Sequence, residues 1–492
     1  MTQPYRILAP LVLLLGALFS LPVPASEETD WTEAIPADVV REDFAALYES
    51  LQSAHADLFA QRSRAEYDAR YRATLATLIT PMTRFEVQVA FQEFVAFGNV
   101  AHARIAFPEA AYEAFREQGG RTFPVFPRFV DGRAYVGDNY SRDARIRAGD
   151  EIVAINGVPM GDWLARTAKH VSADTPYIAH SLLEFTFPRY LWLELGEVED
   201  FTLTLGRDGR LIEFTIDATS RDAQRAAAAA LPESFVLDGS DRTFRMIDER
   251  IGYLRPGPFY SVEDPARPWD NAAFVAFIDS AFDRFVTARA TDLIIDLRHN
   301  PGGDNSFSDA MIAWFADVPF RFCSAFIIRS SDEAAASNAA RLAQHPDATH
   351  STSALLARQY ANMPRGETFE FDIPFSEPRE GPRFEGRVYV LIDRHSYSNA
   401  VTVAAIIQDY EFGIVAGEKT SDMATTYGAM ETFRLPNTGI EVGFPKAHIV
   451  RPSGDTRPDG VTPDWTIPTP TVAGPDDVVL ADLVARIRSR DE

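Results

Sequence analysis

The sequence predicts an α/β protein of several domains, in which a helical region and a β-rich region precede a larger α/β region. Three patterns support this fold class. Apolar residues recur at helical spacing as far as residue 97, alternating strand patterns occupy residues 123–218, and buried strands alternate with helices from residue 250 onward. A chain of 492 residues is also too long for one hydrophobic core, so we expect two to four domains.

The first segment, residues 1–25, has the pattern of an export signal. Arg6 is its only charged residue, residues 7–21 form an apolar run, and residues 23–25 (Val-Pro-Ala) provide small side chains for cleavage. The run is short for a membrane anchor and contains Pro10, and no later segment is apolar enough to cross a bilayer. We therefore expect a periplasmic or secreted protein with no stable membrane insertion after the signal is removed.

The composition of the chain restricts its possible partners and metal sites. Acidic residues outnumber basic ones by 71 to 47, and the net charge of −24 repels phosphate backbones, so we expect no nucleic acid partner. Apolar residues make up 46% of the chain, which is typical of a globular protein. Cys323 is the only cysteine, which excludes disulfides within the chain and cysteine-based metal sites.

An N-terminal helical domain is expected over residues 31–120. Residues 44–51 and 85–94 carry large apolar side chains at helical spacing, and either Thr83 or Thr80 is placed to cap the second helix. Residues 98–105 then predict a short strand that leads out of this domain.

A compact, mostly β domain is expected over residues 121–220. It ends in two alternating segments, residues 201–205 and 211–216, which are joined by a turn at residues 207–209 (Arg-Asp-Gly). This pattern predicts an antiparallel hairpin at the end of the domain.

The α/β domain is expected over residues 240–470. The predicted strands cover residues 251–254, 292–297, 388–392 and 414–416, and the predicted helices cover residues 272–285, 306–315 and 400–408. Residues 332–365 interrupt this alternation with an Ala-rich, polar helical insertion, which we interpret as a surface elaboration rather than a lid over a site.

Two strand-to-helix junctions in this domain carry polar motifs. Residues 296–303 read Asp-Leu-Arg-His-Asn-Pro-Gly-Gly, and glycines at such a turn let backbone N–H groups point into a site. Residues 395–400 read His-Ser-Tyr-Ser-Asn-Ala, which sets two serines just before a helix. A serine there is either a helix cap or a nucleophile whose developing charge the helix dipole stabilises. Asp296 and Arg298 are expected to form a structural pair.

The segment 296–303 resembles the D-L-R-x-N-x-G-G signature of the C-terminal processing peptidases and their tricorn relatives. Other segments resemble that family in the same order. Residues 149–157 are similar to the central stretch of a PDZ domain, residues 251–254 to the first core strand, and residues 459–464 to the closing G-V-x-P-D. The resemblance implies a crotonase-like (ClpP/crotonase spiral) catalytic core, with a PDZ-like domain between it and the helical domain.

The same resemblance implies an activity. Aligned on the segments 408–410 and 417–420, the family nucleophile falls on Ser398, and the family's oxyanion donors fall on the backbone N–H groups of Asn399 and Gly302. A peptidase of this type hydrolyses the peptide bonds of a polypeptide substrate through an acyl-enzyme and needs no metal or organic cofactor.

The general base departs from the family pattern. The processing proteases use a lysine 25 residues after the serine, but Met423 occupies that position, and Lys419 lies at a variable one. The tricorn branch uses a histidine from a G-x-S-H-like segment instead, and residues 98–102 resemble it loosely, which makes His102 the expected base. His395 is the second choice.

Three further assignments complete the expected site. A histidine base needs an acceptor that fixes its tautomer, and in the tricorn type this is an acid near the closing motif, so we expect Asp459 and, as its alternative, Asp455. His299 is expected at the rim of the pocket. The sequence predicts neither a peptide preference nor an oligomeric state.

A rival hypothesis is a non-catalytic protein that binds an apolar ligand or a peptide on the same fold. The interphotoreceptor retinoid-binding proteins belong to the same family, and the loss of the lysine at Met423 fits a protein without activity. Aromatic residues make up 12% of the chain and cluster at residues 185–192, which suits a ligand pocket or a core equally well. Labelling by a fluorophosphonate discriminates between the two hypotheses.

Overall fold

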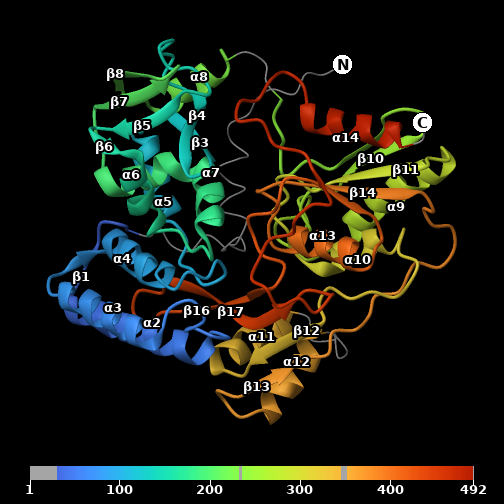
Figure 1. Ribbon diagram of the computed structural model, residues 1–492. Coiled ribbons are helices and arrows are strands. Elements are labelled where there is room, and N and C mark those ends of the chain that lie inside the picture. Colours follow the sequence, from blue (N-terminus) through green and yellow to red (C-terminus); the bar gives the residue numbers. More distant parts are fainter. Residues whose placement is uncertain (1–29, 232–234, 345–351, 491–492) are drawn as a thin grey trace.

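The protein is described here by a computed structural model, in which residues 30–231, 235–344 and 352–490 are described (Figure 1). The expected export signal, residues 1–25, lies outside these residues. Within them, no helix combines the length and the apolar character that a membrane span requires.

The helices are α2 (Ala37–Ala54), α3 (Arg64–Thr77), α4 (Arg84–Ala96), α5 (Glu109–Glu117), α6 (Met160–Ala168), α7 (Pro176–Leu195), α8 (Arg221–Ala228), α9 (Ala272–Thr287), α10 (Asn305–Ile312), α11 (Asp332–Gln344), α12 (Thr352–Asn362), α13 (Asn399–Asp409) and α14 (Val478–Ser489). The strands are β1 (Ala34–Ile35), β2 (Met82–Thr83), β3 (Val125–Val130), β4 (Arg133–Asn139), β5 (Glu151–Ile155), β6 (Val158–Pro159), β7 (Asp200–Arg207), β8 (Arg210–Asp217), β9 (Thr243–Met246), β10 (Ile251–Arg255), β11 (Asp292–Asp296), β12 (Ala325–Arg329), β13 (Thr368–Glu370), β14 (Arg387–Ile392), β15 (Ile414–Gly417), β16 (Thr426–Arg434), β17 (Glu441–Val450) and β18 (Trp465–Thr466).

The N-terminal helices begin at strong caps. Thr83 caps α4 as predicted, and it forms a capping box with Glu86, in which each side chain accepts a hydrogen bond from the other residue's backbone N–H. Ser63 and Glu66 do the same for α3. The helices α2, α3 and α4 bury their apolar sides in one cluster that also contains residues of β12, β13 and β17. The helical region therefore shares its core with strands from the second half of the chain.

The region of residues 125–217 contains the expected antiparallel sheet, in the order β3-β4-β5-β7-β8, with β6 paired to β5. The predicted hairpin is confirmed as β7 and β8. The expectation of a mostly β region is incomplete, because α6 and α7 pack against this sheet. The helix α7 was not predicted from the sequence, because buried side chains lie all around it and leave no amphipathic period.

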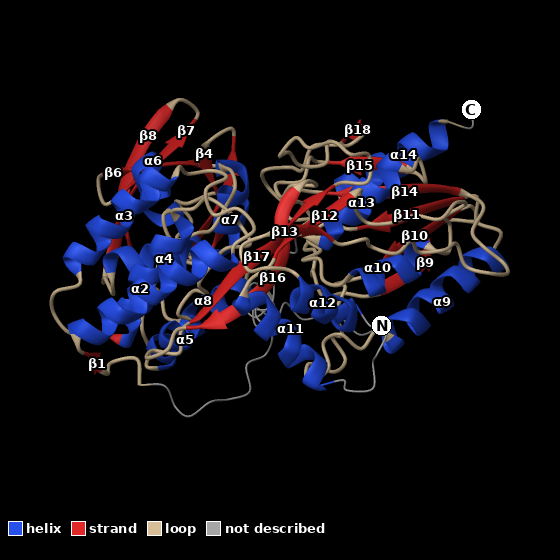
Figure 2. Cartoon of the chain, turned by 90° about the horizontal axis from the view of Figure 1, so that it is seen from below, coloured by secondary structure: helices blue, strands red, loops and turns tan. Residues whose placement is uncertain are grey.

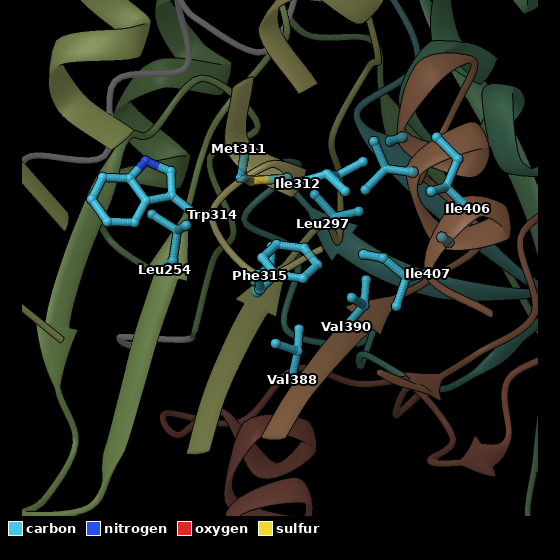
Figure 3. Packing of buried hydrophobic residues seen from close by; sticks show 14 of the residues in the cluster. Leu254, Leu297, Met311, Ile312, Trp314, Phe315, Val388, Val390, Ile406 and Ile407 are labelled. Carbon is cyan, nitrogen blue, oxygen red and sulfur yellow. The ribbon is translucent and has the colours of Figure 1, made fainter. Parts of the chain in front are cut away.

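The α/β region is built on a sheet of order β18-β15-β14-β11-β10-β9, in which only β9 runs antiparallel to its neighbour. Alternate side chains of the strands point to opposite faces. One face packs on α9, α10 and α13, and the other packs on α14 (Figure 1). Figure 3 shows the first face, where Val388 and Val390 of β14 lie near Ile407 of α13. This packing fixes the strand ends that carry both polar motifs.

A second, antiparallel sheet of order β13-β12-β17-β16 joins the two halves of the molecule (Figure 2). The predicted strand at residues 98–105 is wrong: these residues form turns, and Arg104 makes an isolated bridge to Gly443 of β17, with backbone N–H to O distances of 2.9 and 2.8 Å. The bridge holds the segment around His102 against the α/β half of the chain.

The insertion at residues 332–365 is helical, as predicted, over α11 and α12. Its Arg341, which is partly exposed, pairs with the buried Glu431 of β16, and the same carboxylate also pairs with Lys446 of β17 at 2.5 Å. The helix α11 also contacts α2, where Ser53 donates a hydrogen bond to Glu333.

Candidate active site

The two polar motifs follow neighbouring parallel strands, so their loops lie side by side at one edge of the sheet. β11 pairs with β14 in parallel register. The N–H of Tyr397 donates to the carbonyl of Asn300 at 2.9 Å, and the hydroxyl of Ser396 donates to the carbonyl of Leu297 at 2.8 Å. These bonds join the glycine loop to the serine loop.

The expected structural pair of Asp296 and Arg298 is confirmed at the base of these loops. Arg298 Nη2 lies 2.7 Å from Asp296 Oδ2 and 2.6 Å from Asp477 Oδ2. Asp477 caps α14, so this buried arrangement ties the strand end to the helix on the opposite face of the sheet.

Ser398 stands at the N-cap position of α13 but does not cap the helix with its side chain. It precedes α13 with φ 50° and ψ −123°, a backbone conformation that is costly for a residue with a side chain, and its hydroxyl makes no capping hydrogen bond. It is the one residue between Leu391 and Ala400, all of them described, that is not buried. Ser396, in contrast, is fully buried with its hydroxyl engaged. Strain of this kind gathers at functional sites.

The glycine loop lies directly against the serine. A Cβ added to Gly302, which has φ +88°, would lie 2.7 Å from the backbone nitrogen of Asn399 and 2.8 Å from Cβ of Ser398, so only glycine fits. The N–H of Gly302 donates to Asn300 Oδ1 at 2.8 Å. The side chain of Asn399 donates to Ser308 at 2.9 Å, while its N–H lies in the first turn of α13, where no carbonyl of the helix accepts it.

His102 is buried, and it lies close enough to the acid Asp422 for the two side chains to interact electrostatically. Burial lowers the pKa of its ring below the ordinary value, and the nearby negative charge of Asp422 opposes part of that effect. The ring also donates a hydrogen bond to the backbone of Tyr427. The imidazole is therefore neutral at neutral pH and able to accept a proton.

Asp422 links the histidine to the serine loop. Its Oδ2 accepts the N–H of Ser398 at 2.6 Å, its Oδ1 accepts the N–H of Met423 at 2.8 Å, and its side chain is buried. The sequence analysis missed this acid. The available signal was its position beside Met423, where the family pattern requires a catalytic side chain.

A second carboxyl group lies close to Asp422. Asp174 Oδ2 accepts the N–H of Ala101, the neighbour of His102, at 3.1 Å. Burial and the negative charge of Asp422 raise the pKa of Asp174 to about 7. Two acids and one histidine are thus gathered from three distant parts of the chain.

The other expected site residues have different surroundings. Asp459 is exposed, and its carboxylate lies 2.5 Å from Lys419 Nζ and accepts the N–H of Gly460 at 2.9 Å. Asp455, its alternative, pairs with Arg457 at 2.6 Å. These contacts do not involve His102.

His395 and His299 contact each other between the two motif loops. His395 Nε2 is 2.9 Å from Glu184 Oε2, and His395 Nδ1 is 3.2 Å from His299 Nε2. Both ring nitrogens of His395 thus face residues other than Ser398, which does not suit a base for that serine. His299 is partly exposed, in keeping with a residue at a rim.

A serine at a helix N-terminus against a glycine loop is an arrangement that serine peptidases use, and the comparisons agree with that class. Residues 250–467 match the peptidase family S41, and residues 138–183 match the N-terminal domain of Bacteroidetes S41 peptidases. The chain belongs to the S41 family of C-terminal processing peptidases and is a serine peptidase.

Solved structures share the fold over most of the chain. Mature CPAF is 18% identical, with a TM-score of 0.60 over 88% of this chain and 93% of its own. Mature CPAF complexed with lactacystin is also 18% identical, with a TM-score of 0.59 over 88% of this chain and 94% of its own. Among curated proteins, no relative matches the sequence significantly.

Proposed function

We propose that the protein is an exported serine endopeptidase in which Ser398 is the nucleophile and His102 the general base. One observation carries the proposal: Ser398 is a partly exposed residue with a strained backbone, and its hydroxyl does not cap the helix behind it. A residue kept in such a conformation without a structural bond from its side chain fits a hydroxyl that attacks a substrate.

His102 would take the proton of Ser398 as the hydroxyl attacks the carbonyl carbon and then return it to the leaving amine, which yields an acyl-enzyme. The low pKa of the buried ring supports this role, because the base has to be neutral before it acts. Asp422 replaces Asp459 as the proposed acid, since its negative charge favours the imidazolium that forms during attack.

The oxyanion would be held by backbone N–H groups at the start of α13. The N–H of Asn399 is the first donor, with the dipole of the helix behind it. Gly302 is the second donor that the family pattern suggests, and its N–H bonds Asn300 in the present state. We propose that substrate binding turns this peptide toward the oxyanion, because catalytic hydrogen bonds often form only in the substrate complex.

The finer fold assignments belong to the same proposal. Residues 31–120, 121–220 and 240–470 would be a helical domain, a PDZ-like domain and a crotonase-like catalytic domain. Support comes from the antiparallel sheet with α6 and α7 in the second and from the helix-flanked parallel sheet in the third. The segment at residues 1–25 would direct the protein to the periplasm or the exterior, where its substrate is a polypeptide.

Hydrolysis of an unstructured protein tests the proposal. The wild-type protein should degrade it, Ser398→Ala should not, and His102→Ala should lose on the order of a thousandfold in kcat/KM. The double variant should be scarcely worse than either single one, because nucleophile and base act as a unit. Lys419→Ala is the matched control and should retain most activity.

Two results would contradict the proposal. Loss of activity in Lys419→Ala together with normal activity in His102→Ala would establish a displaced Ser-Lys dyad. A folded wild-type protein that cleaves no unstructured substrate, whatever the pH, would favour the rival hypothesis of a ligand-binding protein.

A further inference from the structure

Three metal-ligating side chains meet between the two motif loops. His299 follows β11, and Asp393 and His395 follow β14. The two ring nitrogens, Nε2 of His299 and Nδ1 of His395, lie 3.2 Å apart, and Asp393 Oδ2 lies 3.3 Å from the first and 4.0 Å from the second. The side chains of Asp393 and His395 are buried, whereas that of His299 is 20% exposed.

The spacing of these three atoms fits one zinc ion. A point equidistant from all three lies about 2.1 Å from each, which is the usual zinc–nitrogen and zinc–oxygen distance. Ligands on a tetrahedral zinc are about 3.3 Å apart, whereas neighbouring ligands on an octahedral ion of similar radius are about 3.0 Å apart. The separations of 3.2 and 3.3 Å match the tetrahedral value, whereas the third, 4.0 Å between Asp393 Oδ2 and His395 Nδ1, requires these two atoms to move closer together when a tetrahedral ion binds.

The ligand atoms are held in place by surrounding hydrogen bonds. Asp393 Oδ1 accepts the backbone N–H groups of His299 at 3.1 Å and His395 at 3.0 Å, which turns Oδ2 toward the two rings. Nε2 of His395 lies 2.9 Å from Glu184 Oε2 on α7. This close approach lacks the angle of a hydrogen bond, but the negative charge beside Nε2 favours a proton there and leaves the lone pair of Nδ1 for a metal.

The charges around the cluster are also suited to a cation. Glu184 is already paired with Arg128 at 2.8 Å and with Arg394 at 3.0 Å. Within the described part of the chain, Asp393 has no Lys or Arg partner, and its ionic contacts are the two histidines. A buried carboxylate without a fixed cation is costly, and a metal ion would compensate it.

A second histidine–carboxylate group differs from the first because a lysine already pairs with its acids. Glu93, His170 and Glu194 also bring possible ligand atoms together. Here Lys169 Nζ lies 3.3 Å from Glu93 and 2.9 Å from Glu194, so an ammonium group already compensates both acids. We assign no metal to this group.

We propose that His299, Asp393 and His395 bind one Zn²⁺ ion, with Glu184 holding His395 from behind. Ser398 is not among the three ligands, so we assign the ion to joining the loops and not to hydrolysis. It joins the loop of Gly302 to the loop of Ser398 and attaches both to α7, through Glu184 and through Phe185, whose ring centroid lies 4.5 Å from that of His395. Zinc binding at this site does not depend on the proposed peptidase function, so the two proposals can be tested separately.

Zinc binding is measured on the full-length Ser398→Ala protein, which separates the metal site from hydrolysis. The protein is stripped with a chelator and titrated with ZnCl₂ against a chromophoric zinc indicator, and bound zinc is counted by inductively coupled plasma mass spectrometry. We expect one equivalent per chain. His299→Gln and Asp393→Asn, made in the same background, should bind at least a hundredfold more weakly, and Glu184→Gln about ten- to a hundredfold more weakly.

His180→Gln is the matched control, because His180 is a partly buried histidine of α7 beside Phe129 and supplies no ligand atom to the cluster. It should retain one equivalent. Zinc should raise the melting temperature of Ser398→Ala but not of the variant that also carries Asp393→Asn. This measurement remains informative even if the His299→Gln variant does not fold. No binding at micromolar zinc by folded Ser398→Ala, or equal binding by His299→Gln and Asp393→Asn, would overturn the proposal.

Discussion

Replacing Asp422 by asparagine removes one charge at the centre of the site and leaves the shape of the side chain nearly unchanged. The carboxylate accepts two backbone N–H groups, those of Ser398 and Met423. An amide has one acceptor oxygen, so it has to present its NH₂ group to one of the two donors. The variant therefore perturbs the serine loop and the environment of His102 together.

Two contributions set the size of the effect. A hydrogen bond to a charged group contributes about 1.5–3 kcal/mol, and we expect the free energy of unfolding to fall by about 2 kcal/mol. The attraction between a carboxylate and an imidazolium a few ångström apart is about 3–4 kcal/mol at an effective dielectric constant of 20. Loss of most of this attraction when His102 is protonated should lower kcat/KM roughly a hundredfold.

The assay compares Asp422→Asn with Asp459→Asn on an unstructured protein substrate, with melting temperatures measured alongside. Asp459 is exposed and paired with Lys419, and exposed pairs contribute little, so its variant should stay within about threefold of wild type. Asp422→Asn should also shift the midpoint of the pH profile downward, because Asp422 raises the pKa of His102. A hundredfold loss in Asp459→Asn with normal activity in Asp422→Asn would refute this reasoning.

Three further outcomes are expected. Ser398→Gly should be inactive and yet more stable than Ser398→Ala by about 1 kcal/mol in urea unfolding, because glycine adopts φ 50° without strain. Activity should rise with pH through a midpoint below the ordinary histidine pKa of about 6.5, because burial lowers the pKa of His102 and only the neutral ring accepts a proton. A midpoint above pH 8 would exclude His102 as the base. Asp174→Asn should be more stable than wild type above pH 7, by at most about 4 kcal/mol, and about equally stable near pH 4. The reason is that the pKa of Asp174 is raised to about 7 in the folded state, so its ionisation destabilises the folded protein as the pH rises. Calorimetry at both pH values measures the difference.

The sequence predicted β11, β14 and α13 to within one residue at each end, whereas α10 ends three residues before the predicted limit. β11, β14 and α13 are bounded by glycines and polar residues that interrupt an apolar run, so their limits are local properties of the chain. The helix α7 escaped prediction because it is buried on several sides and contains Pro188, which leaves neither an amphipathic period nor an uninterrupted helical pattern.

The residues of the proposed site could be chosen from the sequence where a motif is continuous. Ser398 and Gly302 stand inside such motifs, and the structure brings their loops into contact. Asp422 was missed because its role arises only when the chain folds back on the serine loop, and Asp459 was chosen for its nearness to a motif although it faces solvent. The segment of His102 was read as a strand because its bridge to Gly443 is a tertiary contact.

Covalent labelling of Ser398 tests the central claim most directly. The folded wild-type protein is treated with a fluorophosphonate and digested, and the modified peptide is identified by mass spectrometry. We expect one phosphonylated residue, Ser398, no label in Ser398→Ala, and strongly slowed labelling in His102→Ala, because the base activates the hydroxyl. Full labelling of the Ser398→Ala protein at another residue, or no labelling of folded wild type, would contradict the account.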